Sequence, residues 1–321
     1  MTDTTRPKRY RMVSKYYKET YGEKVYKLPV ALPLTCPNRD GSAGVGGCTF
    51  CGEIGAGYEN RPAWMTVRMQ LEKNIAHIGP KYKAKKFIPY YQNFSNTYLN
   101  LDDFKSYIEQ GCIDEAVGIA IATRPDCIAD EYLEILADIR KRFQKDIYIE
   151  LGLQTVNYET LEKINRGHDL AQFIDAVLRI KRYGFNITTH MIVNLPWDTM
   201  KDTIEGARIL SALGVDQVKL HALYIVKNTL MAKWYQEGQF TLISAEEYAD
   251  RVVNFVRHLH PDIVLQRLVG RAPEDNTLFT NWSMGWWRVQ DLIDDKLDEL
   301  DAHQGDLCDY LNGKAVRKFI D

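Results

Sequence analysis

Short apolar runs alternate with longer amphipathic segments over most of the chain. Several of the runs are almost continuously hydrophobic, which is typical of parallel strands that are covered on both faces. The predicted strands span residues 25–32, 86–92, 116–122, 146–154, 186–195 and 216–225. Strand–helix units in series predict a parallel sheet whose connections are right-handed crossovers.

The segments between these runs repeat with the period of a helix. In residues 131–143, Leu133, Leu136, Ile139 and Phe143 recur at spacings of three and four, so they lie on one helical face. Further helices are predicted over residues 170–184, 198–214 and 244–259, the last with Ser244 as its cap. Six such units, rather than eight, favour an α/β partial parallel (β/α)6 barrel, although a doubly wound sheet also fits the alternation.

We expect three parts along the chain. A basic N-terminal segment covers residues 1–24, the partial barrel covers 25–230, and a helical C-terminal extension packed on the barrel covers 231–321. The apolar run at 263–270 and the tryptophan-rich segment after it are interpreted as parts of this extension. The chain contains no internal repeat that would indicate a solenoid.

Composition narrows the class of protein without identifying it. No apolar run is long enough to cross a membrane, and the N-terminus lacks the apolar core of a signal peptide. We therefore expect a cytoplasmic protein with no membrane partner, whose thiols stay reduced. The formal net charge of -2 provides no global attraction to nucleic acid.

The stretch TCPNRDGSAGVGGCTFCGEIGAG, residues 35–57, contains Cys36, Cys48 and Cys51 in a glycine-rich loop. A structural zinc site normally has four ligands in two close pairs, whereas this loop offers one pair and one single cysteine. Three thiolates suit a 4Fe-4S cluster that keeps one iron open for a small ligand. We therefore predict that these three cysteines bind such a cluster, with zinc as the alternative. The remaining cysteines are interpreted as structural: Cys112, Cys127 and Cys308.

The pair CTFC, with Phe50 before its second cysteine, resembles the radical S-adenosylmethionine (radical SAM) enzymes. Their usual spacing is C-x3-C-x2-C, and this chain widens the first gap to eleven residues. It is similar in this respect to the branch that contains the Elongator catalytic subunit and the YhcC/YtqA-type proteins. The resemblance spans about residues 20–230. It implies a radical SAM barrel, a 4Fe-4S cluster, S-adenosyl-L-methionine (SAM) as cofactor, and Phe50 beside the cluster.

Two later segments extend the resemblance. Gln92 and Asn93 follow the second strand, where many relatives place Gly-Gly-Glu, so the resemblance assigns them to the amino group of SAM; the alternative is an ordinary polar loop. Residues 151–169 are similar to a G-x-Q-S-x-N…NRGH segment of Elongator-type and coproporphyrinogen-dehydrogenase-type members. There Gln154 is expected to meet the ribose or the substrate, and Arg166 to clamp the methionine carboxylate with its planar fork.

Two further positions are weaker candidates. Glu150 lies on the same strand face as Gln154 and is a second-tier candidate for the barrel interior. Residues 190–202 are similar to the family segment that passes the adenine. None of these assignments identifies a catalytic residue.

The resemblance also implies a reaction. Family members cleave SAM reductively to a 5′-deoxyadenosyl radical, with an electron from a flavodoxin- or ferredoxin-type donor. For the YhcC/YtqA type the implied substrate is tRNA, with conversion of carboxymethylaminomethyl to aminomethyl at C5 of a wobble uridine. Basic and aromatic residues are candidate tRNA contacts, or else solvated and packed side chains: Lys8, Arg9, Arg11, the lysines of 81–86, Trp282, Trp286 and Trp287. The alternatives are a radical SAM enzyme acting on a small metabolite or peptide, and a non-catalytic zinc-binding protein.

Overall fold

A curved parallel sheet forms the centre of the molecule. The computed structural model describes residues 7–55, 58–271 and 275–320. The strand order is β1-β2-β3-β4-β5-β6-β8, and neighbours pair in parallel. The strands are β1 (Val25–Val30), β2 (Lys86–Tyr91), β3 (Gly118–Thr123), β4 (Asp146–Gln154), β5 (Asn186–Ile192), β6 (Gln217–His221) and β8 (Val264–Arg267). The predicted α/β partial barrel is confirmed.

The sheet nevertheless contains one strand more than the six that we predicted. β8 pairs with β6 through Gln217 opposite Val264 and Val218 opposite Leu265. We had interpreted this run as part of the extension. A short apolar run is equally consistent with a strand and with a buried helical segment, so its pattern did not distinguish them. The return of the chain along the β6 edge, after α10, decides that it is a strand.

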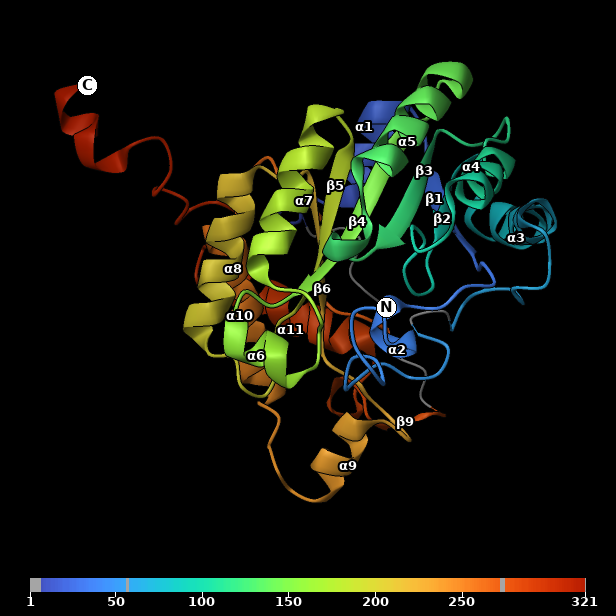
Figure 1. The fold of residues 1–321 in the computed structure, drawn as a ribbon. Helices are drawn as coiled ribbons and strands as arrows, with labels where there is room; N and C mark the ends of the chain where they lie inside the picture. The colour runs from blue at the N-terminus through green and yellow to red at the C-terminus, as the bar shows by residue number, and fades with distance from the viewer. Residues whose placement is uncertain (1–6, 56–57, 272–274, 321) are drawn as a thin grey trace.

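Helices cover the convex face of the sheet (Figure 1). The outward side chains of the strands, such as Ile119, Ile149 and Ile187, are fully buried against residues of these helices, such as Leu136 and Phe173. The helices that follow strands β1 to β6 along the chain are α2 (Pro37–Asp40), α3 (Val67–Tyr82), α4 (Leu101–Gln110), the short η1 (Pro125–Cys127), α5 (Asp130–Phe143), α6 (Tyr158–Lys163), α7 (Leu170–Arg182), α8 (Met200–Leu213), α9 (Leu230–Gln236) and α10 (Ala245–His258). The expected cap of α10 is confirmed, because Ser244 Oγ accepts the Glu247 N–H at 3.1 Å.

The first helix, α1 (Val13–Tyr21), packs across the open side of the half-barrel. It contacts both edge strands, β1 and β8, and Met12 forms a parallel bridge with Leu265. Its Tyr17 is buried with Ile88 and Tyr148 on the inner face of the sheet. The N-terminal segment thus closes the open side of the half-barrel between β1 and β8.

The basic residues at the start of the chain are engaged within the protein. Lys8 pairs with Asp294 and Arg9 pairs with Asp298, both on α11 (Trp286–Glu299). Arg9 Nη1 also lies 2.8 Å from Asp301 Oδ1. These ion pairs attach the N-terminal segment to α11, so the prediction that Lys8 and Arg9 contact tRNA is corrected: both side chains are used within the protein.

The remaining C-terminal elements surround the mouth of the barrel and one flank. β7 (Ile225–Val226) and β9 (Thr277–Phe279) form an antiparallel pair, followed by η2 (Asn281–Ser283) and, after α11, η3 (Lys314–Phe319). Trp282 is packed, with its Nε1 donating to Ile243 O at 2.7 Å, whereas Trp287 is 42% exposed. The segment that ends in η3 extends away from the body (Figure 1). No helix within the described ranges is long and apolar enough to cross a membrane.

Candidate functional site

The cysteine loop lies beyond the C-terminal ends of the strands, around α2 (Figure 1). Cys36 is the N-cap of α2, and Pro37 begins the helix because its fixed φ suits that position. Cys48 and Cys51 are joined by a tight turn in which Cys51 N–H donates to Cys48 O at 2.9 Å. The fold therefore brings the three predicted ligands to one end of the barrel.

A cavity opens at this end of the barrel. Its lining includes all three cysteines and four of the five residues that we predicted to contact the cofactor. Those residues are Cys36, Cys48, Cys51, Phe50, Gln92, Gln154 and Arg166. The cavity is thus shared by residues 36–51, the end of β2, the end of β4 and the loop after α6.

Asn93 is the predicted residue that does not line the cavity. Its side-chain Oδ1 accepts the Leu32 N–H at 3.2 Å, and its Nδ2 donates to Leu32 O at 3.0 Å. The side chain is buried, and both of its polar atoms are hydrogen-bonded to the backbone of Leu32, which follows β1. Asn93 therefore positions the start of the cysteine loop, and its neighbour Gln92 faces the cavity.

Gln154 ends β4 in an unusual backbone conformation. Its φ is 80°, in the left-handed region that side chains other than glycine seldom adopt. The pairing of β4 with β5 also shifts register between Gly152 and Gln154. Local strain of this kind gathers at functional sites, where it redirects a side chain. Here it accompanies a glutamine that faces the cavity.

Hydrogen bonds join the NRGH segment, residues 165–168, and its neighbour Ile164 to the cysteine loop. Asn165 Nδ2 donates to Gly47 O at 2.8 Å, and Thr49 N–H donates to Ile164 O at 3.0 Å. From the other side, Asn38 Nδ2 donates to Asn165 O at 2.6 Å. Two motifs that lie more than a hundred residues apart thus form one unit.

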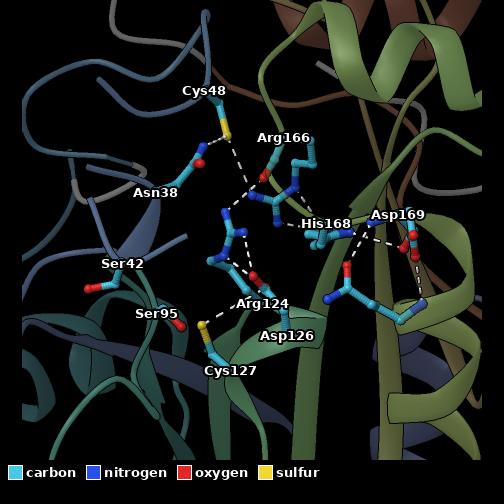
Figure 2. A network of polar contacts seen from close by, with 12 residues as sticks. Asn38, Ser42, Cys48, Ser95, Arg124, Asp126, Cys127, Arg166, His168 and Asp169 are labelled. Atoms are coloured by element: carbon cyan, nitrogen blue, oxygen red, sulfur yellow. Dashed lines mark hydrogen bonds and ion pairs between the residues drawn. The ribbon is translucent and has the colours of Figure 1, made fainter. Parts of the chain in front are cut away.

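Nitrogen donors surround two of the three sulfur atoms. Arg166 Nη1 lies 3.4 Å from Cys48 Sγ, and Asn38 Nδ2 lies 3.6 Å from the same sulfur (Figure 2). Arg39 Nη2 lies 3.6 Å from Cys51 Sγ. A cluster bound by thiolates is electron-rich, and donors at its sulfurs stabilise it and tune its potential.

Arg124 is a cavity residue that the sequence reasoning missed. It directly follows β3, is almost completely buried, and forms a two-pronged ion pair with Asp126 at 2.9 and 2.7 Å. Its Nη1 donates to Arg166 O at 2.9 Å, so it holds the Arg166 backbone (Figure 2). The available signal was a charged residue directly after an apolar strand.

The donor set fits an iron–sulfur cluster better than a single ion. A tetrahedral zinc site would hold its sulfurs about 3.8 Å apart. Among the described residues, no three Cys, His, Asp or Glu side chains gather closely enough to hold one ion. A cluster uses a separate iron for each thiolate and therefore accepts wider spacing. Burial raises the pKa of the Cys51 thiol to about 11, which favours the neutral thiol. Bonding to an iron of the cluster would favour the thiolate instead.

Comparison with known proteins identifies the family. Residues 37–210 match the radical SAM superfamily, and residues 215–299 match the radical SAM C-terminal domain. The chain belongs to the radical SAM superfamily. Within it, the chain lies in the branch of YtqA and YhcC: it is 33% identical to YtqA of Bacillus subtilis over 312 residues, covering 96% of each chain.

Two more distant comparisons concern Elongator-like proteins. The structure of Elp3 from the archaeon Methanocaldococcus infernus superposes with a TM-score of 0.64 at 14% identity, covering 87% of this chain and 64% of that one. The tRNA uridine(34) acetyltransferase of Dehalococcoides mccartyi is 23% identical over 145 residues, which cover 44% of this chain and 30% of that one. Because residues 37–210 match the radical SAM superfamily, the protein is a radical SAM enzyme that uses SAM and a 4Fe-4S cluster.

Asp198, in the segment after β5, has a buried carboxyl group, and burial disfavours the ionised form of that group. Asp198 is 7% exposed, and burial raises its pKa to about 6 from 3.8. The folded protein therefore binds this proton more tightly than the unfolded chain does. The stability contributed by Asp198 is full below about pH 4 and is lost as the pH rises through 6.

We accordingly expect Asp198→Asn to unfold with a higher free energy than the wild type at pH 8, by about 2–3 kcal/mol. The difference should shrink toward pH 4, where the wild-type carboxyl is protonated. Urea titrations at the two pH values measure it, with the exposed Asp114→Asn as the matched control. A gain that is equal at both pH values would contradict the assignment.

Proposed function

We propose that this enzyme modifies the C5 side chain of a wobble uridine in tRNA, converting carboxymethylaminomethyl to aminomethyl. The observation that carries the proposal is the similarity to a tRNA uridine(34) acetyltransferase and, in fold, to Elp3. The similarity to the acetyltransferase covers only part of each chain. The substrate is therefore inferred, whereas radical SAM chemistry follows from the family.

We further propose roles for the residues at the cavity. Cys36, Cys48 and Cys51 would hold the cluster, with Phe50 beside it. Gln92 and Gln154 would bind the amino group and the ribose of SAM, because their amides face the cavity from the ends of β2 and β4. When bound, the two cofactors supply a 5′-deoxyadenosyl radical that removes a hydrogen atom from the substrate. A flavodoxin- or ferredoxin-type protein is the proposed electron donor.

Arg166 is proposed to bind the methionine carboxylate. Its guanidinium reaches the cavity beside Cys48 and is held there by Gly152 O, which accepts from Nη2 at 2.6 Å. Arg124 holds the Arg166 backbone from behind. A planar group fixed in this way is well suited to a two-pronged contact with a carboxylate.

Exposed aromatic and basic side chains support an RNA partner. Trp64, in the segment between the cysteine loop and α3, is 79% exposed and offers a stacking surface for a base. Lys81, Lys83 and Lys85 are exposed at the end of α3 and after it. These lysines, already candidates from the sequence, remain candidate contacts with the phosphate backbone, whereas Lys8 and Arg9 are paired within the protein.

Modified nucleosides from cells with and without the gene test this proposal. Without the gene, carboxymethylaminomethyluridine should accumulate in tRNA, and aminomethyluridine with its derivatives should disappear. Return of the wild-type gene should restore the pattern, and return of Cys36→Ala should not. Unchanged nucleosides, together with no salt-dependent binding of tRNA, would instead favour a small metabolite or peptide as substrate.

A further inference from the structure

A layer of charged and polar side chains lies inside the barrel, and two of its members line the cavity. Its members come from five strands: Lys27 on β1, Glu150 on β4, His190 on β5, Lys219 on β6 and Arg267 on β8. The register places His190 opposite Lys219 and Lys219 opposite Arg267, so these side chains share one face of the sheet. Glu150 and His190 also line the cavity.

Glu150 is the centre of this layer and is completely buried. Its Oε1 accepts from Lys27 Nζ. Its Oε2 accepts from His190 Nε2 at 2.7 Å and from Lys219 Nζ at 3.4 Å. Burial alone would raise the pKa of Glu150, but the charges of Lys219 and Lys27 and the hydrogen bond from His190 hold it well below its ordinary value, so the carboxylate is ionised.

Two histidines continue the layer toward β8. Arg267 Nη2 is a donor only, so His221 Nδ1 accepts from it at 2.6 Å. His221 Nε2–H then donates to His190 Nδ1 at 3.1 Å, and His190 Nε2–H donates to Glu150. Burial lowers the pKa of His190 to about 4 and that of His221 well below 6.5, so both rings are neutral.

The layer therefore holds more positive than negative charge. Lys27, Arg267 and protonated Lys219 are cations; within the described residues Glu150 is the carboxylate paired with both lysines, and the exposed Glu59 acts on Arg267 through its charge. Arg267 Nε is buried and has no hydrogen-bond partner. Burial, with the charges of Arg267 and Lys27, lowers the pKa of Lys219 to about 7. Buried charges without a counter-charge are costly, and a bound anion would relieve the cost.

We propose that this layer binds a carboxylate of the substrate, with Arg267 and Lys219 as its two cationic contacts. The inference rests on the proposed function, in which the group removed from the uridine side chain is a carboxymethyl group. The substrate carboxylate would pass the cofactors and reach the part of the cavity that Glu150 and His190 line. Arg267 offers it an unused guanidinium N–H, the type of donor that recognises carboxylates.

Substrate discrimination tests this proposal in the reconstituted holoenzyme. The two substrates are tRNAs whose wobble uridine carries either carboxymethylaminomethyl or the corresponding carboxamide, which lacks the charge. Wild type should prefer the carboxylate by about 100-fold in kcat/KM. Arg267→Gln and Lys219→Met should each reduce this preference at least tenfold, chiefly through KM. Lys105→Met, an exposed control on α4, should leave it unchanged.

A second measurement uses acetate as the probe and does not depend on tRNA. Acetate should raise the melting temperature of the wild type above that in chloride at equal ionic strength, by about 2 °C at ten times its dissociation constant. In Arg267→Gln, the melting temperature in acetate should equal that in chloride. Without acetate, Lys219→Met should melt at or above the wild type, because it removes one buried cation and Glu150 keeps its contacts with Lys27 and His190. A purely structural layer predicts a lower melting temperature.

The outcomes separate the two proposals. Equal protection of wild type and Arg267→Gln by acetate would overturn the carboxylate site. Turnover of tRNA with unaltered discrimination in both variants would also overturn it, and would leave the proposed function intact. Selective acetate protection, with tRNA not converted, would support the site and refute the proposed substrate.

Discussion

Cys48→Ala protein should be unable to hold a 4Fe-4S cluster and should lose SAM cleavage completely. Cys48 receives hydrogen bonds from Arg166 and Asn38, so its sulfur is the best supported of the three. A cluster already limited to three protein ligands has none to spare. Anaerobic wild-type protein should be brown with about four irons per chain, and the variant should be colourless. Cys36→Ala and Cys51→Ala should lose the cluster and SAM cleavage in the same way as Cys48→Ala.

Cysteines outside the loop provide the matched controls. Cys308→Ala and Cys112→Ala should keep both the iron and the formation of 5′-deoxyadenosine, because these thiols lie far along the chain from the cavity and do not line it. Loss of the cluster in Cys308→Ala would refute the ligand assignment. Stoichiometric zinc without visible absorption in the wild type would refute the cluster itself.

Arg166→Lys should reduce kcat/KM for SAM cleavage by about 100-fold while the iron content stays near that of the wild type. Arg166 uses Nε and Nη2 to hold Gly152 O at 3.2 and 2.6 Å, which leaves Nη1 directed to Cys48 Sγ. Lysine keeps the charge, but its single ammonium cannot make the anchoring contact and a cofactor contact together. Single-turnover formation of 5′-deoxyadenosine, titrated with SAM, measures the loss.

An exposed arginine separates this effect from a general one. Arg182→Lys, at the end of α7, should leave the rate and the apparent affinity for SAM unchanged. If Arg166→Lys retained full SAM cleavage with its cluster intact, the proposed role of Arg166 at the cofactor carboxylate would be wrong. Parallel iron analysis distinguishes that result from simple loss of the cluster.

The sequence predicted most of the sheet because the responsible signals are local. The strand predicted over 146–154 coincides with β4, and the helix predicted over 244–259 differs from α10 by one residue at each end. The apolar period and the cap at Ser244 act within a few residues of one another. β8 was assigned to the extension because a four-residue strand has no period of its own and depends on its neighbour β6.

The candidate site was predictable in kind but not in every member. The spacing of the cysteines indicated a cluster, and the structure places all three at one cavity. Gln92 and Asn93 are adjacent and chemically alike, so only the backbone path decides that one faces the cavity and the other binds Leu32. Arg124 was missed because its relation to Arg166 spans 42 residues.

The amino-acid sequence alone determined the fold class, through its apolar periods, and the family, through the resemblance of its motifs; it also predicted the three thiol ligands. Only the tertiary structure decided how the N-terminal cations are used and which charges meet inside the barrel. Lys27 on β1 and Gln266 on β8 are separated by 239 residues in the sequence, yet Lys27 Nζ donates to Gln266 Oε1 at 2.9 Å between the two edge strands. No local pattern encodes such a pair, because it exists only once the sheet has curved and α1 has closed its open side.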